Sequence, residues 1–441
     1  MNSRNLLLLF CVLNFTFAFS QKSLLQSGPM VGYCEMREAV IWVQTKAKAD
    51  VKISYKDKNT GKIYSSEIVS TEKSHSFTAK LIADSVSPGI EYEYTVFINN
   101  IKVDFDYITT FKTKPLWQFR TDAPDFVLAT GSCAYINEEP FDRPGKPYGG
   151  DYNIFESIAE KKPDIMLWLG DNTYFREADW FSGTGMRNRY THTRSLPQIQ
   201  KLLATASNYA IWDDHDFGPN DSDKSFAMKN TSLDVFKDFW ANPTYGFNDV
   251  NCAFTMFSYS DCDFFLLDNR FFRDADDMKG ENKTVLGKEQ LDMLKNSLSF
   301  SKAKIKFVAM GGQFLTTSKD FETYSNYGFL NERNDILNYI ETNKISNVIF
   351  ISGDRHFSEI SALSNTENPV YDITVSPFTS STSGKKFTDS IVNDLRVAQT
   401  LIYVRNFATI SVNGPKDKRK INIVYFDVNG KEIISYEIQT K

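Results

Sequence analysis

The pattern of apolar residues changes at Lys114-Pro115, and this change constrains the fold more than any other feature of the chain. Before it, short runs in which apolar and polar residues alternate, such as residues 51–55 and 91–98, are separated by turn residues. Runs of this kind are typical of a small antiparallel β-sandwich. We therefore expect a β-sandwich domain over residues 21–115 and a second domain over residues 116–441.

In the second part, apolar strand-like runs alternate with longer amphipathic stretches, which predicts layered α/β structure around a central sheet. The chain then ends in hairpin-like runs, the last two joined by Asn429-Gly430. Strands are expected over residues 126–130, 164–169, 209–212, 263–267, 305–310 and 348–351, and helices over 152–162, 196–206, 233–240 and 288–297.

The first 20 residues have the features of a secretory signal peptide. Arg4 precedes an apolar run over residues 6–19, and Ala18-Phe19-Ser20 offers the small residues of a cleavage site before Gln21. The run is shorter than the roughly 20 apolar residues of a transmembrane helix. We therefore expect an exported protein, periplasmic or secreted, that is a monomer with no integral membrane segment after cleavage.

Composition and missing motifs exclude several functions. Lys and Arg number 50 against 55 for Asp and Glu, a net charge of -5, so no nucleic-acid-binding surface is expected. No glycine-rich loop with the lysine that cradles nucleotide phosphates occurs, which argues against a kinase or ATPase. The Gly-x-Ser-x-Gly motif of many serine hydrolases is also missing.

Cleavage would remove Cys11 and leave four cysteines. An even number in an oxidising compartment favours disulfides, although sequence alone does not fix their pairing. Cys133 follows Gly-Ser at the end of an expected strand and is assigned a different role below. Cys252 and Cys262 flank a hairpin-like segment over residues 253–260 and are the candidate disulfide pair.

Polar clusters follow four of the expected strands, at the position where open α/β sheets carry their functional sites. A lone Asp after a strand usually caps a helix or forms a turn. Three carboxylates beside an imidazole, however, repel one another unless a cation neutralises them. The four clusters together therefore predict a metal centre. They are Gly131-Ser132-Cys133, Gly170-Asp171-Asn172-Thr173-Tyr174, Asp213-Asp214-His215-Asp216 and Gly353-Asp354-Arg355-His356.

The donor types indicate which metals fit. The chain has only four histidines, and His75 lies in the N-terminal part, so a purely zinc-type centre rich in His or Cys is not available. One set of donors favours a hard cation such as Ca²⁺, Mg²⁺ or Mn²⁺, and the other suits a transition ion, Fe³⁺ in particular for a phenolate. The first set is Asp171, Asp214, Asp354 and Asn220, and the second is Cys133, Tyr174 and His356.

The motifs Gly-Ser-Cys, Gly-Asp-x-x-Tyr, Trp-Asp-Asp-His-Asp, Gly-Gly-Gln-Phe and Ser-Gly-Asp-x-His, in this order, resemble the PhoD-type alkaline phosphatases and phosphodiesterases. These are relatives of the purple acid phosphatases within the calcineurin-like metallophosphoesterases. The resemblance runs from about Ser27, including Gly28-Pro29-Met30-Val31-Gly32, to beyond Ser376. It implies a two-sheet β-sandwich flanked by helices in the second domain and hydrolysis of phosphate mono- or diesters.

The resemblance also implies a role for each candidate ligand. Asp171 would bridge two metals, and Cys133 would take the place of an Asp in purple acid phosphatases. The segment from Gly311 to Phe314 lacks the metal-binding His that those enzymes carry nearby, which favours Ca²⁺ over Mg²⁺, Mn²⁺ or Zn²⁺ as the second metal. Fe³⁺ would be held by Cys133, Tyr174 and His356, and the second metal by Asp214, Asp354 and Asn220.

Several roles stay open at this point. The residues from Asp216 to Asn220 depart from the acidic residue and tandem Asn expected in the family, which leaves the role of Asn220 less defined. Asp213 is an alternative to Asp214 as ligand, or a partner that orients His215. Arg355 is expected either to contact a phosphate oxygen or to pair with a structural carboxylate.

The mechanism expected from these assignments is attack on phosphorus by a water that two cations activate, with His215 assisting the leaving oxygen. His192 either lines the substrate cleft or lies on the surface before a helix. One alternative is a phospholipase D-like diesterase acting on lipid headgroups. Another is a β-sandwich binding protein whose catalytic lobe is inactive.

Overall fold

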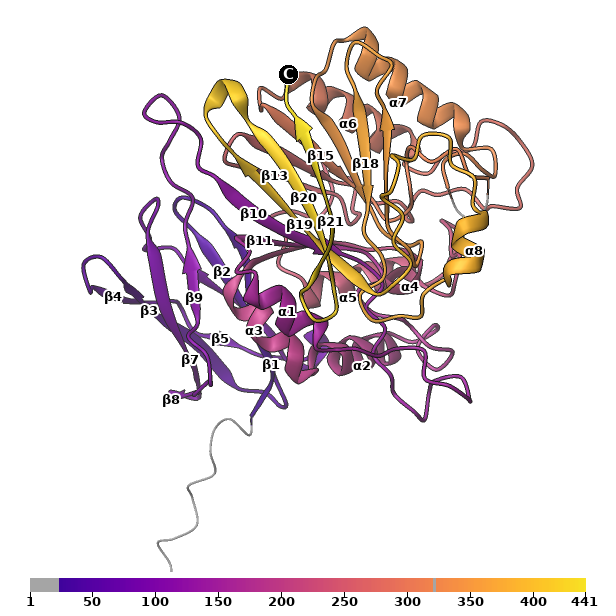
Figure 1. Cartoon of the computed structure of the whole chain (residues 1–441). Helices are drawn as coiled ribbons and strands as arrows, with labels where there is room; N and C mark the ends of the chain where they lie inside the picture. Colours follow the sequence, from indigo (N-terminus) through magenta and orange to yellow (C-terminus); the bar gives the residue numbers. More distant parts are fainter. Residues whose placement is uncertain (1–23, 320–322) are drawn as a thin grey trace, which may run out of the picture.

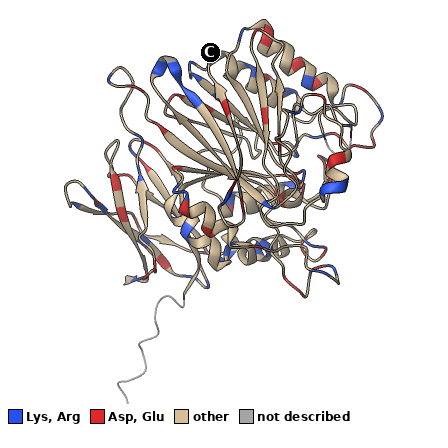
Figure 2. Cartoon of the chain, viewed as in Figure 1, with Lys and Arg blue, Asp and Glu red and all other residues tan. Residues whose placement is uncertain are grey.

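The computed structural model describes residues 24–319 and 323–441 (Figure 1). The signal peptide predicted over residues 1–20 lies outside these ranges, so export stays a prediction. None of the helices in the described ranges is long and apolar enough to cross a membrane. Figure 2 shows basic and acidic residues interspersed along the chain in this view, as expected from the nearly balanced composition.

The N-terminal part is a sandwich of two antiparallel sheets, which confirms the predicted architecture. Inward-facing side chains from both sheets, such as Val43 and Ile53, form its core. The first sheet has the order β1 (Leu25–Cys34), β2 (Ala39–Thr45) and β6 (Thr78–Ala83). The second contains β4 (Ile63–Ser65), β3 (Asp50–Asp57), β7 (Glu91–Ile98) and β8 (Ile101–Lys102), with β5 (Val69–Ser70) on β3 and β9 (Thr110–Lys112) on β7.

The second part is built on two six-stranded sheets that face each other. In the first sheet the order is β12 (Ser207–Ile211), β11 (Ile165–Leu169), β10 (Phe126–Gly131), β19 (Asn406–Asn413), β20 (Lys420–Asp427) and β21 (Glu432–Gln439). In the second it is β13 (Thr255–Tyr259), β14 (Cys262–Leu266), β15 (Ile305–Ala309), β16 (Val348–Ser352), β18 (Val370–Thr374) and β17 (Glu359–Leu363).

Helices cover the outer face of each sheet, so the layers run helix, sheet, sheet, helix (Figure 1). Successive residues of a buried strand serve different layers: Leu128 of β10 packs between the sheets, and Ala129 packs under the helices. The first sheet carries α1 (Ile154–Glu160), α2 (Gly183–Arg194), α3 (Gln200–Thr205) and α5 (Lys229–Phe239), and the second carries α6 (Gly287–Phe300) and α7 (Leu330–Thr342). Short helices are α4 (Asp214–Phe217) and α8 (Lys385–Ser390).

The N-terminal sandwich also contributes side chains to a core of the second part, the one beneath the helices of the first sheet. Trp42 of β2 is fully buried in the cluster beneath α1, α2, α3 and α5, and its indole nitrogen donates to the carbonyl of Asp238 at 2.8 Å. At Gly32 the backbones approach so closely that a Cβ there would lie 2.5 Å from that of Ala241. The sandwich is therefore packed rigidly against the first sheet and its helices.

The structure corrects two sequence predictions. Residues 253–260 do not form a hairpin, because they contain the single strand β13, which pairs with β14. Cys252 and Cys262 are not a disulfide but buried free thiols in two different cores. Cys262 lies opposite Tyr259 at one end of β13, and Cys252 lies beyond the other end, three residues before Thr255. The four steps from Thr255 to Tyr259 alone span about 13 Å at roughly 3.3 Å per residue. A disulfide requires Cα atoms within about 7 Å.

We predict that a chain starting at Gln21 carries four free thiols, at Cys34, Cys133, Cys252 and Cys262. Unfolding in urea with a chelator and without reductant should expose all four to a chromogenic thiol reagent, because burial rather than oxidation protects them. A fully reduced sample is the control. A titre of two thiols in the unreduced sample would contradict the structure.

Candidate metal centre

The four polar clusters meet at one end of the two-sheet sandwich. Strands β10, β11 and β12 are parallel, so their carboxyl ends lie at the same edge, and β16 of the facing sheet ends beside them. The loops after β10 and β16 almost touch, since a Cβ on Gly353 would lie 2.5 Å from the Cβ of Ser132. The site therefore lies between loops that belong to both sheets.

The backbone of these loops is in an uncommon conformation. Cys133, Asp171, Asp354 and His356 all have φ between 51° and 67°, in the left-handed region that residues other than glycine rarely adopt. Each such residue costs on the order of 1–3 kcal/mol and persists only where the surrounding structure enforces it. The clustering of four at the strand ends indicates a functional site.

One donor group combines sulfur, phenol and imidazole around Asp171. The sulfur of Cys133 lies 3.6 Å from Oδ2 of Asp171. The hydroxyl of Tyr174 lies 3.5 Å from Nε2 of His356. Ser376 connects Cys133 to His356, because its hydroxyl is 3.3 Å from the Cys133 sulfur and accepts a hydrogen bond from the His356 backbone N–H at 2.9 Å. The three donors predicted to suit a transition ion are thus brought together.

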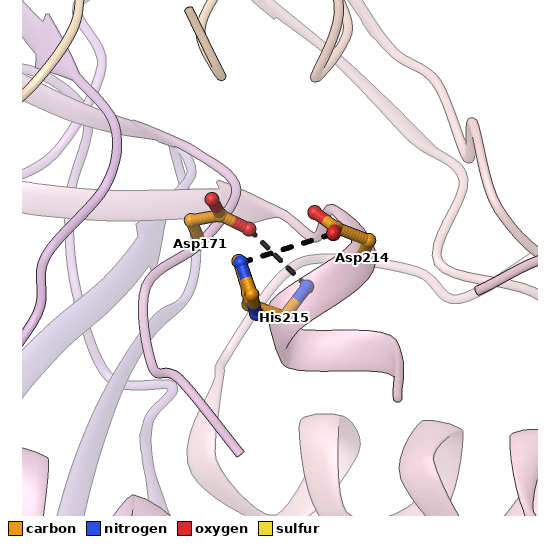
Figure 3. Close-up of side chains that lie close together, drawn as sticks. All are labelled: Asp171, Asp214 and His215. Carbon is orange, nitrogen blue, oxygen red and sulfur yellow. Dashed lines mark hydrogen bonds and ion pairs between the residues drawn. The ribbon is translucent and has the colours of Figure 1, made fainter. Parts of the chain in front are cut away.

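A second donor group is rich in carboxylates. Asp171, Asp214 and His215 place one ligand atom each within 4.8 Å of one another, and so do Asp213, Asp214 and Asp354. Figure 3 shows His215 between Asp171 and Asp214, with its backbone N–H 3.3 Å from Oδ1 of Asp171 and its Nε2 3.8 Å from Oδ2 of Asp214. Asp171 therefore belongs to both donor groups.

Burial and mutual repulsion disfavour the charged forms of these donors. Burial, then the carboxylates of Asp214 and Asp213, hold the pKa of Asp171 well above its usual range. Burial and the neighbouring Asp171 likewise raise the pKa of the Cys133 thiol and of the Tyr174 hydroxyl. A bound cation reverses this effect because it stabilises the anionic ligands. The donor set is therefore one that could hold metal ions.

Arg270 supplies part of the positive charge and was missed by the sequence analysis. Its Nε donates to Oδ1 of Asp213, which also accepts from the Asn269 amide at 2.7 Å, and its Nη2 lies 3.7 Å from Asp214. Arg270 and Asp213 are both about 1% exposed. Asp213 is thus an ion-pair partner of Arg270 as well as a member of the carboxylate group.

Asp216 fixes the two loops that carry Asp171 and Asp214. Its carboxylate accepts from the backbone N–H groups of Asn172 at 3.0 Å, Thr173 at 3.2 Å and Asp213 at 3.1 Å. Burial raises the pKa of Asp216 to about 7, although these hydrogen bonds oppose the shift. This residue connects the end of β11 to the start of α4.

Tyr174 is supported by a buried ion pair. The guanidinium of Arg176 stacks on the Tyr135 ring at 3.8 Å and donates to the backbone carbonyl of Tyr174. Asp142 accepts from Arg176 Nε at 2.9 Å and from the Tyr135 hydroxyl at 2.8 Å. On the other side, the rings of Tyr174 and His215 lie 4.2 Å apart. The phenol is therefore held in one orientation.

Two predicted residues, Asn220 and His192, lie away from the donor groups, whereas the charge of Arg355 is close enough to His356 to lower the pKa of its imidazole. Asn220 is exposed, and the group that reaches Asp214 from its loop is the backbone N–H of Asp221, at 2.8 Å from Oδ2. Arg355 is 5% exposed, with its guanidinium 5.3 Å from the centre of the Phe357 ring. His192 lies in α2, not before a helix, with Nδ1 4.0 Å from Glu138.

A helix-flanked two-sheet sandwich with these donors at its strand ends defines a metallophosphoesterase-like protein. The model of the PhoD-like phosphatase family matches residues 128–413, so the chain belongs to this family. A model described as a domain of unknown function matches residues 22–115.

Individual relatives agree with this assignment. Alkaline phosphatase D of Bacillus subtilis (strain 168) is 23% identical over 355 residues, which cover 70% of this chain and 58% of that protein. The solved structure of PhoD is 19% identical, with a TM-score of 0.77 over 95% of this chain and 91% of that one. A purple acid phosphatase from yellow lupin (Lupinus luteus) seeds is 11% identical, with a TM-score of 0.65 over 94% of this chain and 74% of that one. Both structures share the fold.

We predict that Arg270→Ala lowers the free energy of unfolding by about 3–5 kcal/mol in the presence of chelator, because it leaves buried carboxylates without their cation. Urea unfolding measures this loss. Lys288→Ala is the control, because Lys288 pairs with Asp292 on the surface, and its removal should leave the free energy of unfolding unchanged within the error of the measurement.

Adding Asp213→Asn separates charge from packing. If the uncompensated carboxylate causes the loss, Arg270→Ala/Asp213→Asn should be more stable than Arg270→Ala alone. Equal or additive losses would mean that the Arg270 side chain stabilises the site by packing only.

Proposed function

We propose that this protein hydrolyses phosphate mono- or diesters with the help of two metal ions at the strand-end site. The observation that carries the proposal is the position of Asp171, which lies in contact with both the sulfur-containing donor group and the carboxylate group. One carboxylate between two unlike donor sets is the arrangement needed to bridge two unlike cations.

Fe³⁺ would be held by Cys133, Tyr174 and His356, and Ca²⁺ by Asp214 and Asp354, with Mg²⁺, Mn²⁺ or Zn²⁺ as alternatives for the second metal. Burial, followed by repulsion from His215, lowers the pKa of His356 to about 4, so its imidazole is neutral and keeps a lone pair for a metal. When bound, two cations would lower the pKa of a water and neutralise charge on the phosphoryl oxygens.

His215 is the residue best placed to assist the leaving oxygen. Its side chain is 23% exposed at the start of α4, while the carboxylate beside it is nearly buried. Its Nε2 lies 3.8 Å from Oδ2 of Asp214, and the Tyr174 ring holds the imidazole from the other side. A protonated imidazole at the open side of the site would donate to the departing alkoxide. Arg355 is buried beside the Phe357 ring, and we assign it a supporting role.

Export and a monomeric state are part of the proposal. The sequence of residues 1–20 supports cleavage before Gln21. Delivery of the mature chain to the periplasm or the medium is tested by N-terminal sequencing of the protein recovered from each fraction, and its mass in solution tests the monomer.

We predict that Asp171→Ala lowers the rate of nitrophenyl phosphate hydrolysis more than about a hundredfold and reduces the content of both metals, because both donor groups lose a shared ligand. Elemental analysis of unexchanged protein measures the second effect. Asp104→Ala, at an aspartate whose side chain is 80% exposed, is the matched control. Unchanged hydrolysis in Asp171→Ala would end the catalytic assignment.

We also predict that the metal-loaded protein absorbs visible light through charge transfer from the Tyr174 phenolate to Fe³⁺. Tyr174→Phe should weaken and shift the band, leaving the thiolate contribution of Cys133, while circular dichroism stays native, because only the hydroxyl is removed. Tyr148→Phe serves as comparison, since its hydroxyl lies 3.3 Å from His356 but outside the proposed ligand set. A band whose position and intensity are unchanged in Tyr174→Phe would exclude the phenolate ligand.

A further inference from the structure

A cavity of about 670 Å³ lies beside the metal centre. Tyr148 lines this cavity and also contacts the centre, because its hydroxyl lies 3.3 Å from Nδ1 of His356. Ser381 and Thr382 line it as well, and they follow Ser380, whose hydroxyl is 3.3 Å from Nε2 of His356. The cavity therefore adjoins the centre at Tyr148 and at the segment that follows Ser380.

The wall of the cavity is rigid. Arg405 donates to Asp151 at 2.8 Å, to the carbonyl of Ser380 at 2.8 Å and to the carbonyl of Tyr148 at 3.2 Å. A Cβ on Gly150 would lie 2.7 Å from this guanidinium, so the backbone packs directly against it. The N–H groups of Arg405 thus connect the segment from Tyr148 to Asp151 with the segment around Ser380, and both segments form part of the cavity wall.

The charges around the cavity balance. Lys146 and Arg405 face it together with the carboxylates of Asp151 and Asp427. A ligand group with a further strong charge would meet charges of both signs. A neutral group with several hydroxyls is favoured instead, because hydroxyls donate to carboxylates and accept from the ammonium of a lysine.

Two tyrosines add flat apolar surface to this polar lining. Tyr148 and Tyr403 both line the cavity, and the Lys385 ammonium lies 4.7 Å from the centre of the Tyr403 ring. Aromatic rings offer large contact area at a small cost in side-chain entropy, and the C–H face of a saturated ring packs well on them. Hydroxyl partners and aromatic surfaces together match a hydroxylated ring.

We propose that this cavity, lined by Lys146, Tyr148, Tyr403 and Asp427, binds the neutral hydroxylated ring of a phosphate ester whose phosphoryl group lies at the metal centre. The proposal rests on the phosphoesterase function above and narrows its substrate class to esters of cyclic sugars. Hexose phosphates and ribonucleotides share this chemistry, and the experiment separates them.

The first test compares Tyr403→Ala with the unmodified protein on glucose 1-phosphate, adenosine 5′-phosphate and ethyl phosphate, by release of inorganic phosphate. We expect KM for at least one ring ester to rise about tenfold, as for the loss of one stacking contact, while kcat and the ethyl phosphate reaction stay unchanged. The ester affected identifies a hexose or a ribonucleoside. Tyr403→Phe should behave as the unmodified protein.

The control variant is Tyr339→Ala, at a tyrosine of α7 that also has a lysine, Lys295, 5.4 Å from its ring centre. It should alter no KM. If Tyr403→Ala affects all three esters equally, or none of them, the cavity does not bind the ring and the proposal is overturned.

Binding without phosphate distinguishes the cavity from the catalytic function. Saturation-transfer NMR with methyl glucoside and with adenosine should detect binding to the metal-loaded protein and its loss in Tyr403→Ala. Ring binding in a protein that hydrolyses no ester would disprove the proposed function and keep the cavity assignment. Hydrolysis of esters without ring binding, and without an effect of Tyr403→Ala, would keep the proposed function and disprove the cavity assignment.

Discussion

Repulsion among buried carboxylates is the constraint on which the rest of the site depends. Asp171, Asp213, Asp214 and Asp216 are all nearly buried at one end of the sandwich, where few water molecules can screen them. Neighbouring groups offset part of this repulsion. Arg270 forms an ion pair with Asp213, and the carboxylates of Asp216 and Asp214 accept hydrogen bonds from backbone N–H groups. What these leave uncompensated, chiefly at Asp171, is the charge that a cation would neutralise.

The loops can concentrate charge in this way because two sheets support them. Parallel strands bring three carboxyl ends to one edge, and the facing sheet adds the fourth. Glycines then allow the approach: a Cβ on Gly311 would lie 2.3 Å from the Asp213 carboxylate, and one on Gly170 would lie 2.8 Å from the Asp213 backbone nitrogen. The left-handed residues turn the chain sharply after β10, β11 and β16, so the donors face a common space.

The sequence predicted features whose residues are adjacent in the chain, but not the contacts between residues that are far apart in it. The strands and their polar ends were readable, because an apolar run and the cluster behind it are contiguous. Helix α2 was missed since its sequence, GTGMRNRYTHTR, has almost no apolar stripe and is stabilised by its contacts. Arg270 was missed because its partner Asp213 is 57 residues away. The contact from Asp221 uses a backbone N–H, which every residue except proline has, so no side-chain pattern could reveal it.

The packing of Trp42 beneath the helices has a consequence for how the chain assembles. The residues that contact the first strands are synthesised much later. The Gln26 side chain donates a hydrogen bond to Ser195, and the Trp42 indole donates one to Asp238, 196 residues further along the chain. Strand β10 likewise pairs with β19, almost at the other end of the polypeptide. The entropy of closing such long loops is lost before the contacts between their ends can stabilise the chain, and this slows folding. During synthesis, Trp42 therefore stays exposed until the residues that cover it have been made. A chain without the N-terminal sandwich would expose the apolar site that Trp42 fills, and this surface would favour aggregation.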